Sequence, residues 1–190
     1  MKPWRVLRGL PVFCYQLLCG SVRANESRAG AELRRWLYHT DCHIDTRVHI
    51  TNARNFSCGQ GCALYHSTYV LNGQGTFSMG AHTHLGAFCY VNAEHGAVRL
   101  GDHVAVGPGT KIFSYSNHYA RGRRVTEERK VADVVIGNNV FIGANSTILP
   151  GTRVHDHVVI AAGSVARGEL RGNAVYAGVP CRTIREGWYE

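Results

Sequence analysis

Residues 136–164 decide the fold of this 190-residue chain, and they read IGNNVFIGANSTILPGTRVHDHVVIAAGS. Every sixth residue of the stretch is a branched aliphatic: Ile136, Ile142, Ile148, Val154 and Ile160. The residue four places after each of them is small or β-branched: Val140, Ser146, Thr152, Val158 and Ser164. A period of six is neither the 3.6 of an amphipathic helix nor the 2 of a half-buried strand. It indicates an all-β solenoid, in which short strands alternate with tight turns and three sides complete one coil of a prism.

The same period continues upstream, but with interruptions. Three further sets of aliphatic or sulfur-containing residues keep the spacing of six: Leu100, Val106 and Ile112; Met79, Leu85 and Val91; and, more weakly, Cys58, Leu64 and Val70. Successive sets are separated by nine residues instead of six, and Ile112 and Ile136 lie 24 residues apart. Because each break follows the third side of a coil, we expect all of them to stack on one corner of the prism. The longest break, residues 114–133, should project as a loop, and long loops in compact repeats usually carry function.

This pattern divides the chain into three parts. Residues 1–43 are predicted to form an N-terminal helical, basic segment, and residues 44–176 the solenoid with its loop at 114–133. Residues 177–190 are predicted to form a short C-terminal helix.

Charge and hydropathy limit the partners. The formal net charge is +8, which favours an anionic partner. No apolar run is long enough for a transmembrane helix. The basic start followed by apolar residues 10–18 is how a signal peptide begins, but Pro11 and Gln16 interrupt it. An amphipathic helix that caps the fold is favoured, and peripheral contact with an anionic membrane is the alternative.

The cysteines suggest a reducing compartment. The chain has seven, an odd number, and no pair of CxxC motifs. Cys58 and Cys62 lie four apart, but no second pair is available to complete a zinc site. We therefore predict buried thiols, a cytoplasmic location and no bound metal.

Two segments resemble a known family, the hexapeptide-repeat acyltransferases of the maltose and galactoside O-acetyltransferase branch. They are residues 135–151, VIGNNVFIGANSTILPG, and residues 177–185, AGVPCRTIR. The segment at 100–102 that leads to Asn117-His118 is also similar, and the resemblance covers about residues 58–187. It implies a left-handed parallel β-helix and a homotrimer, with acetyl-CoA and the acceptor bound in clefts between neighbouring prisms and no metal.

The resemblance also implies roles for individual residues. His118 matches the family's catalytic histidine. The residues that correspond to CoA-binding positions are Ala144, Ala162, Arg167, Arg182 and Arg185. Arg167 stands one place earlier than the family's basic residue. Phe141 replaces a tryptophan common in the family, and the acceptor-lining positions read Ala87 and His95.

The chemistry of acyl transfer gives an independent reason for these choices. A base must take the proton of the acceptor, and a histidine can accept and return a proton near neutral pH. Among eleven histidines we choose His118, because it lies on the predicted corner loop. A backbone N–H near Gly143-Ala144 is the candidate donor to the oxyanion. Glu94, His95 and Asn117 are predicted to line the acceptor site. Transfer is expected to be direct, in a ternary complex.

The predicted function is therefore acetyl-CoA-dependent O-acetylation of a hydroxyl on a sugar, a surface polysaccharide or its precursor, with the basic N-terminal segment suited to the inner face of the membrane. N-acetylation of an amino-sugar nucleotide, or of an antibiotic, is the alternative. A β-helical zinc carbonic anhydrase, using His82, His84, His103 and His118, and a non-catalytic scaffold are further readings. The run 121–130 carries both signs of charge, so nucleic-acid binding is not expected.

Overall fold

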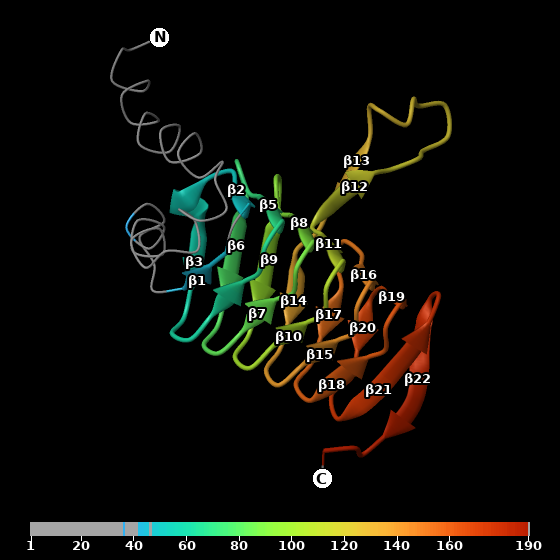
Figure 1. Ribbon diagram of the computed structural model, residues 1–190. Helices are drawn as coiled ribbons and strands as arrows, with labels where there is room; N and C mark the ends of the chain where they lie inside the picture. The colour runs from blue at the N-terminus through green and yellow to red at the C-terminus, as the bar shows by residue number, and fades with distance from the viewer. Residues whose placement is uncertain (1–35, 37–41, 46, 190) are drawn as a thin grey trace.

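The computed structural model describes residue 36, residues 42–45 and residues 47–189 (Figure 1). The predicted N-terminal helical segment lies almost entirely outside these residues, so its helicity and its contact with a membrane remain predictions. No helix within the described residues has the length and hydropathy needed to cross a membrane.

Three parallel sheets form the faces of a prism, and each coil contributes one strand to each sheet. Sheet A contains β1 (His43–Ile44), β4 (Ala63–Leu64), β7 (His84–Leu85), β10 (Ala105–Val106), β15 (Phe141–Ile142), β18 (Val158–Ile160) and β21 (Ala174–Gly178), with β22 (Cys181–Glu186) at its end. Sheet B contains β2 (His49–Ile50), β5 (Tyr69–Leu71), β8 (Tyr90–Asn92), β11 (Lys111–Phe113), β16 (Thr147–Ile148) and β19 (Val165–Ala166). Sheet C contains β3 (Phe56–Cys58), β6 (Thr76–Met79), β9 (Ala97–Leu100), β14 (Val134–Ile136), β17 (Arg153–Val154) and β20 (Glu169–Leu170). The chain is a left-handed parallel β-helix.

The six-residue period produces the core. In sheet A, Val106 pairs with Ile142, which in turn pairs with Ile160, and all three side chains are buried. Ile112 and Ile148 are stacked in the same way in sheet B. Burying one such side chain stabilises the fold by about 1.5–3 kcal/mol. The stacked aliphatic columns therefore hold successive coils in register, as the sequence predicted.

The small residues of the repeat satisfy backbone groups at the turns. The Thr110 hydroxyl donates to the Gly143 carbonyl at 3.2 Å, and the Thr68 hydroxyl donates to the Gly86 carbonyl at 3.1 Å. Both threonines are fully buried. Each hydroxyl thus bonds the next coil where the strand ladder is interrupted by a turn.

The breaks in the repeat stack on one corner, as predicted. Each lies between a strand of sheet B and the next strand of sheet C, and we call this edge the B–C corner. Neighbouring insertions bond to one another: the Gly75 N–H donates to the Glu94 carbonyl at 2.9 Å, and the Ser114 N–H to the Asn92 carbonyl at 2.8 Å. An additional short insertion in the first coil contains the 3-10 helix η1 (Ala53–Asn55).

The longest insertion is an antiparallel hairpin rather than an irregular loop. Its strands are β12 (Tyr115–Asn117) and β13 (Arg129–Val131), and Figure 1 shows it projecting from the body of the prism. We call residues 115–131 the hairpin. The prediction of a protruding segment at 114–133 is confirmed, and the strands within it give the projection a defined register.

The predicted C-terminal helix at 177–190 is wrong. Residues 181–186 form β22, which turns back and pairs antiparallel with β21. Gly178, with a φ of 104°, permits the turn, and β-branched Thr183 and Ile184 favour an extended backbone. The pairing also covers the backbone groups of β21 at the end of sheet A, which a helix would have left exposed.

Candidate active site

Ala144 and Ala162 lie on successive coils at the turns between sheet A and sheet B, which we call the A–B corner. The Gly163 N–H donates to the Ala144 carbonyl at 2.9 Å, so the two turns are in direct contact. A side chain on Gly143 would lie 2.4 Å from the Ala162 nitrogen. Glycine is therefore required at 143, where the turns of two successive coils pack backbone against backbone.

The amide groups of this corner differ in their availability. The Gly143 N–H already donates a hydrogen bond to the Ile160 carbonyl at 2.7 Å. Within the part of the chain that the structure describes, no acceptor is found for the amide N–H of Ala144 or of Ala162. These two N–H groups can thus donate to a ligand. Of the predicted oxyanion donors at Gly143-Ala144, only the Ala144 N–H is available.

Arg182 and Arg185 lie on β22 and not on a helix. They are opposite Ala177 and Val175 of β21, and the register shifts between those two pairs. Because Ala177 and Val175 are two residues apart, this bulge keeps both arginines on the outer face of sheet A. The Gly178 N–H donates to the Ser164 hydroxyl at 3.2 Å, so the β21–β22 turn packs beside the Ala162 coil. Arg182 lies next to this turn, and Arg185 lies further along the strand.

Arg167 lies apart from the other predicted cofactor residues. It follows β19 and is exposed at the B–C corner. Ala162 precedes that strand at the A–B corner. The structure therefore does not bring Arg167 together with Ala144 and Ala162 within one chain.

His118 follows β12 directly and is exposed on the hairpin. Its backbone N–H donates to the Glu128 carbonyl at 2.9 Å, and its ring stacks on Tyr119 with centroids 5.4 Å apart. Asn117 ends β12 opposite Arg129. The hairpin thus fixes the backbone of His118 while leaving its imidazole open to a substrate.

Glu94 and His95 lie in the insertion below the hairpin, but they make different contacts. The Glu94 carboxylate accepts from the Gly73 N–H at 2.9 Å, which ties it to the previous insertion. The His95 ring meets Tyr115 edge-on at 5.0 Å, and its Nε2 lies 3.2 Å from Arg129 Nη1. Because a guanidinium can only donate, His95 Nε2 is the acceptor in this contact.

The base of the hairpin is anchored by an ion pair that the sequence did not reveal. Asp133 accepts from the Ala97 N–H and from Arg99 Nη1, each at 2.9 Å. The Ala97 N–H and then the Arg99 guanidinium lower the pKa of the Asp133 carboxyl. Like the contact of Arg129 with His95, this bond joins residues more than 30 positions apart, so no local spacing indicates it.

The histidines of the zinc alternative do not converge within the chain. His82 and His103 stack with centroids 5.1 Å apart at the corner between sheets C and A, whereas His118 is on the hairpin. No group of three or more His, Cys, Asp or Glu suited to a metal occurs among the described residues.

The buried Cys89 thiol has its pKa raised to about 11 by desolvation.

A shallow pocket of about 560 Å³ lies at the C-terminal end of the prism. Its lining combines β20 to β22 and includes Glu169, Tyr176, Thr183 and Glu186. None of the predicted site residues lines it.

The two halves of the predicted site lie on opposite edges of sheet B. Pro108 shares the A–B corner with Ala144, because its carbonyl accepts from the Asn145 N–H at 2.9 Å. Ser114, six residues later, directly precedes the hairpin. Between them lies β11 (Lys111–Phe113), and at about 3.3 Å per residue the six residues span at most roughly 20 Å. Within one chain, the hairpin that carries His118 and the free amides of Ala144 and Ala162 are therefore on opposite edges of sheet B.

Comparisons with known proteins identify the repeat. Residues 133–168 match the model of the family described as bacterial transferase hexapeptide (six repeats). The galactoside O-acetyltransferase of Escherichia coli is 36% identical over 115 residues, which cover 58% of this chain and 57% of that protein. The putative lipopolysaccharide biosynthesis O-acetyl transferase WbbJ of E. coli is 49% identical over 53 residues, 28% of this chain and 27% of WbbJ. The chain spans between a quarter and three fifths of the length of these two relatives.

Solved structures share the fold. A maltose O-acetyltransferase from Clostridium difficile superposes with a TM-score of 0.62 at 21% identity, covering 94% of this chain and 85% of that one. AntD, an N-acyltransferase from Bacillus cereus solved as a mutant in complex with dTDP and coenzyme A, gives 0.70 at 20% identity, covering 77% and 80%.

Proposed function

This chain contains a hexapeptide-repeat domain homologous to the galactoside O-acetyltransferases, and on that premise we propose that it transfers an acetyl group from acetyl-CoA to a sugar hydroxyl. The acceptor is a sugar, a surface polysaccharide or its precursor. The observation that carries the proposal is the homology over 115 residues, together with a hairpin that holds an exposed histidine.

The A–B corner fits acetyl-CoA. The amides of Ala144 and Ala162 are free to donate among the described residues, and glycines at 107 and 143 let the turns of successive coils pack directly against one another. Arg182 adds a cation beside the same corner, where it can meet a phosphate of the cofactor. Arg185, on the same face, can act similarly, whereas Arg167 lies at the other edge of sheet B.

The reaction needs one base and one oxyanion donor. His118 takes the proton from the acceptor hydroxyl as its oxygen attacks the thioester carbonyl. In this proposal the Ala144 N–H donates to that carbonyl oxygen and stabilises its negative charge. When the C–S bond breaks, the imidazolium returns the proton to the sulfur of CoA. No covalent enzyme intermediate is needed, because both substrates are held together.

The separation of the two corners is best resolved by a homotrimer. If three copies pack with sheet B facing the axis, the B–C corner of one copy adjoins the A–B corner of the next. His118 of one copy then meets the free amides of its neighbour. Of the predicted acceptor residues, Asn117 and His95 lie on the face of the hairpin opposite His118, and Glu94 lies in the insertion below it, so a place in the acceptor site of this shared cleft stays a prediction for all three.

The character of the faces supports this packing. The outward residues of sheet B include the aromatics Tyr69, half-exposed at 50%, Tyr90 and Phe113, with exposed Lys111 beside Tyr90 in the same sheet. The outward residues of sheet C are mostly polar or charged: Ser57, Ser78, Arg99, Arg153 and Glu169. Exposed aromatic surface, as on sheet B, is typical of an interface, whereas the charged surface of sheet C is typical of a face in contact with solvent.

The product of the reaction tests the proposal. Incubating the chain with acetyl-CoA and a panel of sugars, amino sugars and nucleotide sugars should give acceptor-dependent release of CoA. Mass spectrometry should then show an acetyl ester that mild alkali removes. An alkali-stable amide on an amino sugar would replace O-acetylation by N-acetylation. The absence of CoA binding would contradict both.

A further inference from the structure

The hairpin has two faces, and the catalytic histidine occupies only one of them. Ser116 is opposite Lys130 and Asn117 is opposite Arg129, and the bond from the His118 N–H to the Glu128 carbonyl continues the ladder. Residues directly opposite share a face, and faces alternate along a strand. His118 and Lys130 therefore lie on the same face, and Arg129 lies on the other.

Most cationic side chains of the hairpin already contact another side chain. Arg123 pairs with Glu128 at 3.6 Å, and Arg124 pairs with Glu127 at 3.7 Å. Arg129 contacts His95 Nε2 on the opposite face and lies over the Tyr115 ring. Each of the two acidic side chains of the turn thus has an arginine partner, including Glu128, which shares the face of His118 and Lys130.

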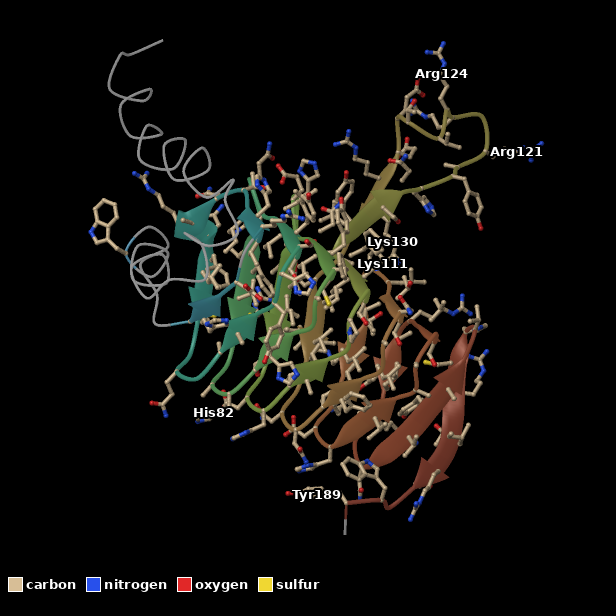
Figure 2. The ribbon with its side chains drawn as sticks, in the orientation of Figure 1. His82, Lys111, Arg121, Arg124, Lys130 and Tyr189 are labelled. Atoms are coloured by element: carbon tan, nitrogen blue, oxygen red, sulfur yellow. The ribbon has the colours of Figure 1, made fainter. Side chains whose placement is uncertain are left out.

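Lys130 and Arg121 are different, because the side chain of neither has an ion-pair or hydrogen-bond partner among the residues that the structure describes. Both are exposed. Figure 2 shows Arg121 and Arg124 at the outer end of the hairpin and Lys130 near its base, where it leaves the prism. Lys130 is therefore an uncommitted cation on the face of His118 and close to the prism.

We propose that Lys130 binds an anionic group of the acceptor, so that the sugar acetylated by this chain carries a carboxylate or a phosphate. This inference rests on the proposed O-acetyltransferase function. Diagonal neighbours on one face of an antiparallel pair lie about 7–8 Å apart, so the Lys130 ammonium and the His118 imidazole can contact opposite sides of one sugar ring. An acidic hexose or a sugar phosphate fits this spacing, and a neutral hexose leaves Lys130 without a partner.

Matched acceptors test the inference. Galactose and glucose would each be compared with their uronic acid and with their 6-phosphate, in the presence of acetyl-CoA. The wild-type chain should use at least one anionic form about tenfold better in kcat/KM than the neutral parent, the size of one charge-assisted contact. Lys130→Gln should remove this preference while turnover of the neutral sugar is unchanged. The uronate and phosphate arms identify which anion is recognised.

The control variant is Arg124→Gln, which removes the same charge from a residue already paired with Glu127. It should keep the wild-type preference, and increasing salt should reduce that preference in the wild type but not in Lys130→Gln. Equal use of neutral and anionic sugars, or equal losses on both in Lys130→Gln, would overturn the inference and leave the acetyltransferase proposal standing. If the wild-type chain does not bind CoA, both proposals fail.

Discussion

Replacing His118 with alanine is expected to lower acetyl transfer roughly 100- to 10,000-fold while CoA affinity stays nearly unchanged. The imidazole is the proposed base for the acceptor hydroxyl, and it lies on the hairpin, away from the A–B corner where the cofactor is proposed to bind. Its backbone N–H, not its side chain, bonds Glu128, so truncation leaves the hairpin ladder in place. The loss should appear in kcat rather than in the KM for acetyl-CoA.

Steady-state kinetics at saturating acceptor, with calorimetric titration of CoA, measure both quantities. His155→Ala is the matched control, because His155 is also exposed but bonds Glu169 across sheet C, far from the hairpin. It should retain wild-type kinetics. A loss below about tenfold in His118→Ala, or a parallel collapse of CoA binding, would remove His118 from the role of base.

A charge in the centre of sheet B is expected to separate the copies and to abolish activity with them. Tyr90 lies on the outward row of this sheet between Tyr69 and Lys111. Tyr90→Arg would bury a cation without a partner if the copies still packed through this face, which costs several kcal/mol. Because each proposed site needs His118 from one copy and the A–B corner from another, activity should fall at least about 100-fold.

Light scattering, circular dichroism and turnover on the same sample separate assembly from folding. Ser57→Arg is the control, since it adds the same charge to the outward row of polar sheet C. That variant should stay assembled and active. A folded Tyr90→Arg monomer with wild-type turnover would show that the site is complete within one chain.

The repeat could be predicted from the sequence because its geometry is local. One inward aliphatic every six residues fixes the strand, the turn and the face at once, so Ile142 and Ile148 had to point into the prism. The breaks could be placed on one corner for the same reason. When two inward aliphatics are nine residues apart instead of six, the second still points into the prism only if the three additional residues form a loop at a turn.

Contacts that depend on tertiary structure could not be predicted. The interval between Arg182 and Arg185 fits one face of a helix, and it fits one face of a strand only when a bulge adds a residue, as it does here. Arg129 and His95 are 34 positions apart, and Asp133 and Arg99 are also 34 apart. Pairing within the hairpin brings Arg129 back beside Tyr115, and no periodicity of the loop predicts that register.

Mixed oligomers test most directly the claim that the site is built between copies. His118→Ala lacks the base, and Ala162→Trp would obstruct the A–B corner, so each variant alone should be inactive. After the two are unfolded together and reassembled in equal amounts, about a quarter of the sites should combine an intact His118 with an intact A–B corner of the neighbouring copy. The account predicts that activity returns to about that fraction of the wild-type level. A mixture that forms mixed oligomers and remains as inactive as its parents would contradict it.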